Sequence, residues 1–203
     1  MQINIDKKTG ILLSIIGALL IAIVLAASGG MRDSDSDNDD MGMMGGHGHN
    51  SNSQMVGSDA MFLQMMIPHH QQAIDISNIA LKTSKDAELL TLAKTIIKAQ
   101  TAEIVQMKSW LNDAGATTDM GHSMSGMGGM LDDAELSVLS AASGKNFDLL
   151  WLKGMIGHHD GAIHMTTMIR DASNADIKTF GENVVKDQSA QIVQMNAMLK
   201  RIG

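Results

Sequence analysis

Apolar residues recur every three to four positions through most of the chain, and this period predicts α-helices. The clearest such stretches are residues 58–83, 89–111, 147–172 and 175–202, with a shorter one at residues 131–143. Polar residues mark their ends: Ser58 or Asp59 suits the first N-cap, Ser84 suits the second, and Gly115 suits a helix stop. Pro68 lies inside the first stretch, where its missing N–H predicts a kink or an early end of that helix.

The four long stretches form two similar halves. The sequence FLQMMIPHHQQAIDIS at residues 62–77 aligns with WLKGMIGHHDGAIHMT at residues 151–166, and AQTAEIVQMKSWL at residues 99–111 aligns with DQSAQIVQMNAML at residues 187–199. A helical hairpin with one apolar face buries that face when a second such hairpin packs on it. We therefore predict an all-α four-helix bundle from two duplicated helical hairpins, residues 58–114 and 145–203. A Met/Gly-rich linker with a short helix, residues 115–144, joins them.

Residues 1–28 contain the apolar run ILLSIIGALLIAIVLAA, which follows Lys7 and Lys8. As a helix this run spans roughly 26 Å, at the short edge of what crosses a bilayer. The small residues that end it also fit a signal-peptide cleavage site. Lysines before the run and aspartates after it place the N-terminus in the cytoplasm and the remainder outside. We predict an exported protein on the periplasmic or another extracytoplasmic face, anchored in the cell membrane by this N-terminal hydrophobic helix unless it is cleaved.

Residues 29–57 are acidic at first and then rich in Met, His and Gly. Such a segment buries too little apolar surface to fold, so we predict a disordered linker. Its part at residues 41–49 has three Met and two His on a Gly-rich backbone, which can gather weakly around a soft ion. Residues 115–130, GATTDMGHSMSGMGGM, have the same character.

Composition excludes several classes of function. The formal net charge of -7 argues against a nucleic-acid partner, which would need a basic surface. The chain has no Cys, which rules out a disulfide framework, a zinc finger and a thiol nucleophile. Met is the outlier, with 19 residues. Inside helices a Met can be flexible core filler or a ligand, but in the Gly-rich segments there is no core for it to fill.

The chemistry concentrates in a short unit that occurs twice, M-I-P-H-H at residues 66–70 and M-I-G-H-H at residues 155–159. On a helix, positions three and four apart share a face. Each unit therefore brings one thioether beside two imidazoles: Met66 with His69 and His70, and Met155 with His158 and His159. Thioether sulfur with imidazole nitrogen is a ligand set for copper, above all Cu(I). The side chains of two consecutive His point about 100° apart, so the two imidazoles of each pair can face different neighbouring helices.

The second helix of each half adds further candidates. Glu103 and Met107 follow Gln100 at i+3 and i+7, and the other half has Gln188, Gln191 and Met195 in the same register. If this stripe faces the His pair, Met107 and Met195 are candidate thioether ligands. Glu103 is then either a carboxylate ligand or an acceptor for an imidazole N–H.

The two halves differ at one further informative position. Asp75 in the first half aligns with His164 in the second, which makes His164 a further candidate ligand.

At these residues the chain resembles a bacterial domain-of-unknown-function family whose members carry M-I-x-H-H followed by a helix A-Q-x-x-E-I-x-x-M, and which includes CopM-like copper-binding proteins. The resemblance covers residues 58–114 and 145–202. It implies a ferritin-like four-helix fold, an exported location, and binding of copper or silver in resistance or trafficking. By position it carries over Met66, His69, His70 and Met107 in one half and Met155, His158, His159 and Met195 in the other. Gln191 stands where the family has Glu, and Gly157 where the first half has Pro68.

The favoured interpretation is a non-enzymatic copper-binding protein that buffers or traffics the metal. A di-iron oxidase on a similar bundle needs Glu from several helices together with Glu-x-x-His pairs. The helical part contains only Glu88, Glu103, Glu135 and Glu182, and no Glu-x-x-His. A His phosphotransfer bundle does not explain the Met, and an exported chain has no ready phosphodonor. A membrane-anchored structural or interaction module without metal chemistry is the alternative. A copper-transfer partner and a homo-oligomer both stay open. Since imidazole must be neutral to ligate, we expect His-dependent binding to weaken below about pH 6.

Overall fold

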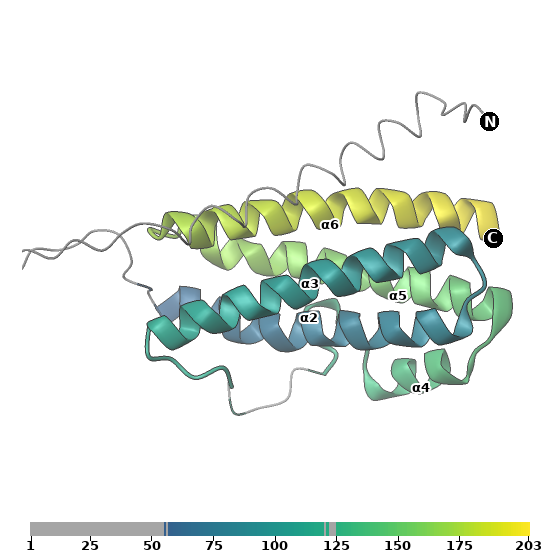
Figure 1. The fold of residues 1–203 in the computed structure, drawn as a ribbon, viewed down its shortest axis with the longest axis horizontal. Coiled ribbons are helices and arrows are strands. Elements are labelled where there is room, and N and C mark those ends of the chain that lie inside the picture. The colour runs from purple at the N-terminus through teal and green to yellow at the C-terminus, as the bar shows by residue number, and fades with distance from the viewer. Residues whose placement is uncertain (1–54, 56, 120, 122–124) are drawn as a thin grey trace, which may run out of the picture. The chain divides into compact units, whose positions relative to one another are not determined.

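The computed structural model describes residues 55, 57–119, 121 and 125–203. In these residues the elements are α2 (Gly57–Thr83), α3 (Ala87–Asp113), the 3-10 turn η1 (Met127–Gly129), α4 (Asp133–Ala141), α5 (Gly144–Met165), the 3-10 turn η2 (Thr166–Ile169) and α6 (Ala175–Ile202) (Figure 1). No strand occurs in this part of the chain. The predictions for residues 1–54, including the membrane helix and the Met/His-rich linker, lie outside the described residues. None of the helices in the described part combines the length and apolar character that a membrane crossing requires.

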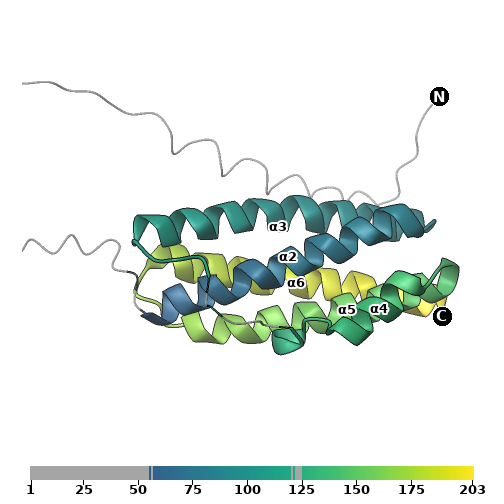
Figure 2. The ribbon, with the colours of Figure 1, turned by 90° about the horizontal axis from the view of Figure 1, so that it is seen from below.

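The four long helices form a bundle of two hairpins. Helix α2 packs most extensively on α3, and α5 on α6, while α2 also packs along α5 and joins the hairpins. Figures 1 and 2 show the four axes running side by side, with the short α4 lying along α5. The predicted all-α four-helix bundle is therefore confirmed.

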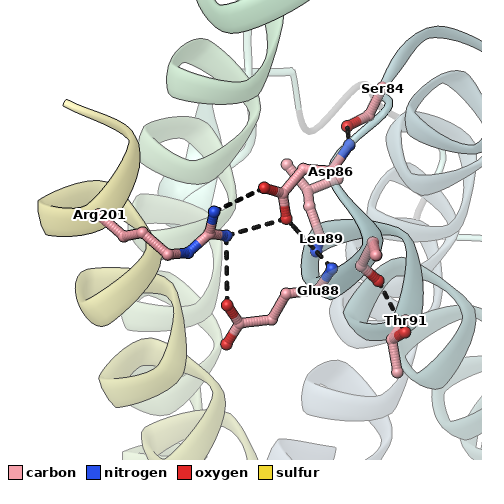
Figure 3. Close-up of polar contacts among 7 residues, drawn as sticks. Ser84, Asp86, Glu88, Leu89, Thr91 and Arg201 are labelled. Atoms are coloured by element: carbon pink, nitrogen blue, oxygen red, sulfur yellow. Dashed lines mark hydrogen bonds and ion pairs between the residues drawn. The ribbon is translucent and has the colours of Figure 1, made fainter.

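Side chains cap the N-termini of α3, α4 and α6. Helix α2 begins at Gly57, so Ser58 and Asp59, the residues predicted to cap it, lie inside the helix. The cap of α3 is Asp86, whose carboxylate accepts from the N–H groups of Glu88 and Leu89 at 3.1 and 3.0 Å. The prediction of Ser84 as this cap was wrong, because its hydroxyl instead accepts from the Asp86 N–H at 3.1 Å. The same Asp86 carboxylate pairs with Arg201 near the end of α6, at 2.8 and 2.9 Å (Figure 3). This ion pair joins the start of α3 to the end of α6.

Helix α2 runs through Pro68 without ending, contrary to one of the two expectations for that residue. Proline removes one backbone hydrogen bond. On either side of Pro68, however, α2 has side chains buried in the core, namely Met66, Ile67, His69 and His70. Tertiary packing therefore holds the helix together across a residue that disfavours it locally.

The core divides into two apolar clusters at opposite ends of the bundle. One contains Trp151, Leu152, Leu92, Met155 and Met195 among others, and the other contains Phe62, Leu63, Met66, Met107 and Phe180 among others. On each long helix, buried His or Gln residues lie where membership passes from one cluster to the other. A polar layer therefore crosses the middle of the bundle.

Candidate metal centre

The layer between the two clusters, called here the His layer, consists of six buried polar side chains. They are His69 and His70 on α2, Gln100 on α3, His158 and His159 on α5, and Gln188 on α6. All four His side chains are 0% exposed. Polar groups this deep are costly unless they find partners, so their partners decide what the layer can do.

The two His pairs meet where α2 passes α5. The rings of His69 and His158 lie on one another, with centroids 3.8 Å apart and planes tilted by 40°. His70 lies 6.3 Å from His69, and His159 lies 6.4 Å from His158. The four imidazoles therefore form one cluster with closely matched halves.

The other member of each pair turns to the second helix of its own hairpin. His70 Nε2 lies 2.7 Å from a Glu103 carboxylate oxygen, and His159 Nε2 lies 2.6 Å from the Gln191 side-chain oxygen. Consecutive helical side chains diverge by about 100°, which is how each pair reaches both the opposite hairpin and its own. The stripe predicted on α3 and α6 faces the His pairs at these two residues.

His69 has a partner that the sequence did not indicate. Its Nε2 lies 2.8 Å from the carbonyl oxygen of Gly128 in η1. We call residues 128–131 the strap, because they run across α2 and α5 beside the His layer. Gln72 of α2 holds the strap from one side: its amide donates to Leu131 O at 2.8 Å, and its oxygen accepts from the Leu131 N–H at 2.7 Å.

The strap approaches α5 closely at two glycines. A Cβ added at Gly161 would overlap the Gly128 carbonyl, and one added at Gly129 would overlap the Gly157 carbonyl. Gly128 itself has φ 56°, a backbone conformation that favours glycine. The signal for this contact was Gly161, since a glycine inside a helix lets another backbone approach closely at that position. The sequence interpretation missed the strap and assigned residues 115–130 to a linker with weak metal affinity.

Burial keeps three imidazoles of the His layer, those of His69, His158 and His159, neutral. Desolvation, with a smaller contribution from the charge of His70, lowers the pKa of His69 to about 3. Desolvation likewise lowers the pKa of His159 to about 4 and holds the pKa of His158 well below its usual range. Because imidazole ligates metals only in its neutral form, these three side chains are ready to bind a metal at physiological pH.

Several ring atoms in the layer have no hydrogen-bond partner. These atoms are the Nδ1 of His69, His70 and His159, and both ring nitrogens of His158. A buried acceptor left without a partner costs about 1–3 kcal/mol, and a bound cation would satisfy such atoms. Within the described residues, however, no three His, Asp or Glu side chains converge as a metal-binding group. A metal here would therefore need ligands of another kind as well.

Thioethers lie on both sides of the layer. Met66 and Met107 belong to one apolar cluster, and Met155 and Met195 to the other. All four side chains are 0% exposed. Each is a core residue by packing. Met66 and Met155 lie one helical turn before their His pairs, and Met107 and Met195 lie one turn after Glu103 and Gln191.

His164, the remaining candidate, is exposed on the last turn of α5. Asp160, one turn earlier, is exposed as well, and Met168 in η2 is half-buried. The structure therefore brings nine of the ten candidates into or beside the His layer, leaves His164 at the surface, and adds Gly128 and Gln72.

A family model described as "Domain of unknown function (DUF305)" matches residues 59–199. The chain belongs to the DUF305 family. The match spans both hairpins and the strap, so the DUF305 domain includes every described site residue. No curated protein matches the sequence significantly.

Solved structures similar to this DUF305 domain carry the same fold. One is a DUF305 protein from Streptomyces coelicolor, described as a candidate secreted protein, with 30% identity, a TM-score of 0.68, and 72% of this chain and 92% of that chain covered. A DUF305 fragment from Deinococcus radiodurans has 29% identity, a TM-score of 0.68, and coverages of 72% and 97%. CopM in its Cu(I)-bound form has 30% identity, a TM-score of 0.61, and coverages of 73% and 98%. CopM is also known in Cu(II)-bound and Ag-bound forms.

Proposed function

We propose that this DUF305 protein binds copper, as Cu(I) in preference to Cu(II), and Ag(I) as its analogue, in the His layer. The observation that carries the proposal is the cluster of four fully buried imidazoles with unpartnered ring nitrogens. Buried Met66, Met107, Met155 and Met195 supply soft sulfur on both sides of the cluster. Neutral nitrogen and thioether sulfur together select soft ions such as Cu(I) and Ag(I) over magnesium or calcium.

The likeness to CopM supports the metal, since CopM has been crystallised with copper and silver ions. The Streptomyces relative supports an exported location. We propose a non-enzymatic role in copper buffering or trafficking outside the cytoplasm, where a chain without Cys avoids thiol oxidation. Membrane anchoring through residues 1–28 is part of this proposal and rests on sequence alone.

The test replaces His69, His70, His158 and His159 together by Ala in the full chain, purified in mild detergent. We expect the variant to lose most of its bound Cu(I) and Ag(I), measured by competition with a chromophoric chelator and by metal analysis. Far-UV circular dichroism must show that the helices are retained. The matched control is Met61→Leu, because Met61 is 49% exposed on the same α2 helix. Unchanged copper stoichiometry in the quadruple variant would refute the site and favour a structural module in which the imidazoles only pack.

A further inference from the structure

Three of the four imidazoles in the His layer share one pattern: Nε2 has an oxygen partner and Nδ1 has none. The oxygen comes from the Gly128 backbone for His69, from Glu103 for His70 and from Gln191 for His159. The three Nδ1 atoms are buried without a partner.

The chemistry of the oxygen partners decides where the proton sits. A carbonyl oxygen, whether from a peptide or an amide side chain, can only accept a hydrogen bond, and an ionised carboxylate likewise only accepts. A neutral imidazole, the form that ligates a metal, carries a single ring proton. That proton is on Nε2, where it is donated to oxygen, and the lone pair is therefore on Nδ1.

We infer that Nδ1 is the atom through which His69, His70 and His159 each bind metal, without all three meeting at one ion, and that the strap, Glu103 and Gln191 are positioning residues that fix these rings through Nε2. The inference rests on the proposed function and specifies its atoms. Metal-binding His residues commonly donate their second N–H to a carbonyl or carboxylate, which fixes the tautomer and raises the basicity of the ligating nitrogen. Glu103 is accordingly not a ligand, which resolves the choice left open by the sequence.

The strap is built to present one carbonyl to His69. Its position depends on Gly161, where any side chain would overlap the Gly128 carbonyl, and on the paired hydrogen bonds between Gln72 and Leu131. Gln72 and Gly161 occupy equivalent positions in the two aligned halves. One half therefore supplies the hydrogen bonds that hold the strap, and the other supplies the space that it needs.

Two matched substitutions in α5 distinguish an effect of the strap on metal binding from an effect of changing the helix itself. In Gly161→Ala the new methyl group displaces Gly128, whereas in Gly157→Ala the new Cβ meets nothing within 4 Å. Both changes lie on one face of α5 and both improve helix propensity by about 1 kcal/mol. Neither removes a candidate ligand. We expect Gly161→Ala to weaken Ag(I) and Cu(I) binding by about 10–100-fold, the usual cost of losing an outer-shell partner, and Gly157→Ala to bind as wild type.

Nitrogen NMR of the metal-free full chain gives a second, independent measurement, because protonated and unprotonated imidazole nitrogens have different chemical shifts. The inference predicts that His69, His70 and His159 are all protonated on Nε2, and that Gly161→Ala perturbs the signal of His69 alone. Protonation of His69 on Nδ1 in the wild type would overturn the assignment of the ligating atom. This result is obtained without metal, so it is distinct from a failure of the proposed function, which the quadruple His variant tests.

Three further variants keep the inference testable if Gly161→Ala does not fold. Gln72→Ala removes both hydrogen bonds to Leu131 without adding a clash, and we expect it to weaken Ag(I) binding in the same direction. Glu103→Gln keeps an oxygen acceptor for His70, as Gln191 already provides for His159, and should retain Ag(I) binding where Glu103→Ala loses it. Equal losses in Glu103→Gln and Glu103→Ala would show that the carboxylate itself is a ligand and would overturn the positioning role. Wild-type affinity in Gly161→Ala or Gln72→Ala would overturn the role of the strap.

Discussion

The two hairpins make the same contact with different chemistry. His70 of the first hairpin meets a carboxylate, Glu103, at 2.7 Å, while His159 of the second meets an amide, Gln191, at 2.6 Å. The distances are nearly equal, although one acceptor carries a charge and the other does not. Both hairpins therefore satisfy the same need for an oxygen acceptor at Nε2, and only the first adds negative charge beside its imidazole.

The strap introduces a second difference between the halves. His69 receives the Gly128 carbonyl, whereas its counterpart His158 has no hydrogen-bond partner on either ring nitrogen. The strap thus breaks the symmetry of the His layer at the point where the two rings stack. Two sequence units that look alike consequently differ in how firmly their imidazoles are oriented.

The largest expected effect that separates the halves comes from the thioethers. Met66→Leu with Met107→Leu removes sulfur from one cluster, and Met155→Leu with Met195→Leu removes it from the other. Leu fills a similar volume, so the packing cost stays below about 1.5 kcal/mol per site. We expect each double variant to lose at least about tenfold in Cu(I) affinity, equivalent to about 1.4 kcal/mol, measured by chelator competition. Wild-type affinity in one of the two variants would assign the metal to the opposite cluster.

The pH dependence of stability is the next effect in size. The pKa values of His69 and His159 in the folded chain, about 3 and about 4, lie below the ordinary value of 6.5. Between these values the unfolded chain binds protons that the folded chain does not, so the free energy of unfolding falls as pH decreases below about 6.5. Each such imidazole contributes a slope of about 1.4 kcal/mol per pH unit.

Urea denaturation of the metal-free chain between about pH 7.5 and pH 4.5 measures this slope around the ordinary His pKa. The quadruple His→Ala variant is the control and should show a much shallower dependence. An equal dependence in both chains would contradict the burial of neutral imidazoles. The lowered pKa values also revise the expectation that His-dependent binding weakens below about pH 6. In the folded chain, direct proton competition at His69 and His159 begins only near pH 4.

The smallest expected effect tests the charge difference between the halves. A carboxylate acceptor raises the basicity of its imidazole and adds negative charge, both of which favour Cu(II) over Cu(I). We expect Glu103→Gln to lower the affinity for Cu(II) relative to Cu(I) by up to about tenfold, and Gln191→Glu to raise it. Anaerobic and aerobic titrations of the same preparations give the two affinities. Parallel shifts for both oxidation states would show that the charge does not discriminate between them.

Local patterns in the sequence were sufficient to predict most of the architecture. The helical period, the aligned halves and the M-x-x-H-H units predicted two hairpins with paired imidazoles facing Glu103 and Gln191. Local signals were weaker at single residues. Ser84 was a reasonable cap by type, but Asp86 lies at the correct position to accept from Glu88 and Leu89 and also binds Arg201. Pro68 predicted a kink or an early end, yet packing on both sides keeps α2 continuous.

The sequence by itself determined the helices, their pairing and the positions of the candidate soft ligands, because periodicity and residue type are local properties of the chain. Only the tertiary structure decided that His69 stacks on His158, that the two Met pairs lie in opposite clusters, and that His164 stays at the surface. It also decided that Gly128 faces His69, a contact between residues 59 positions apart. These features depend on how α2 meets α5 and on the space that Gly161 leaves, and no local pattern encodes the distance between two packed backbones.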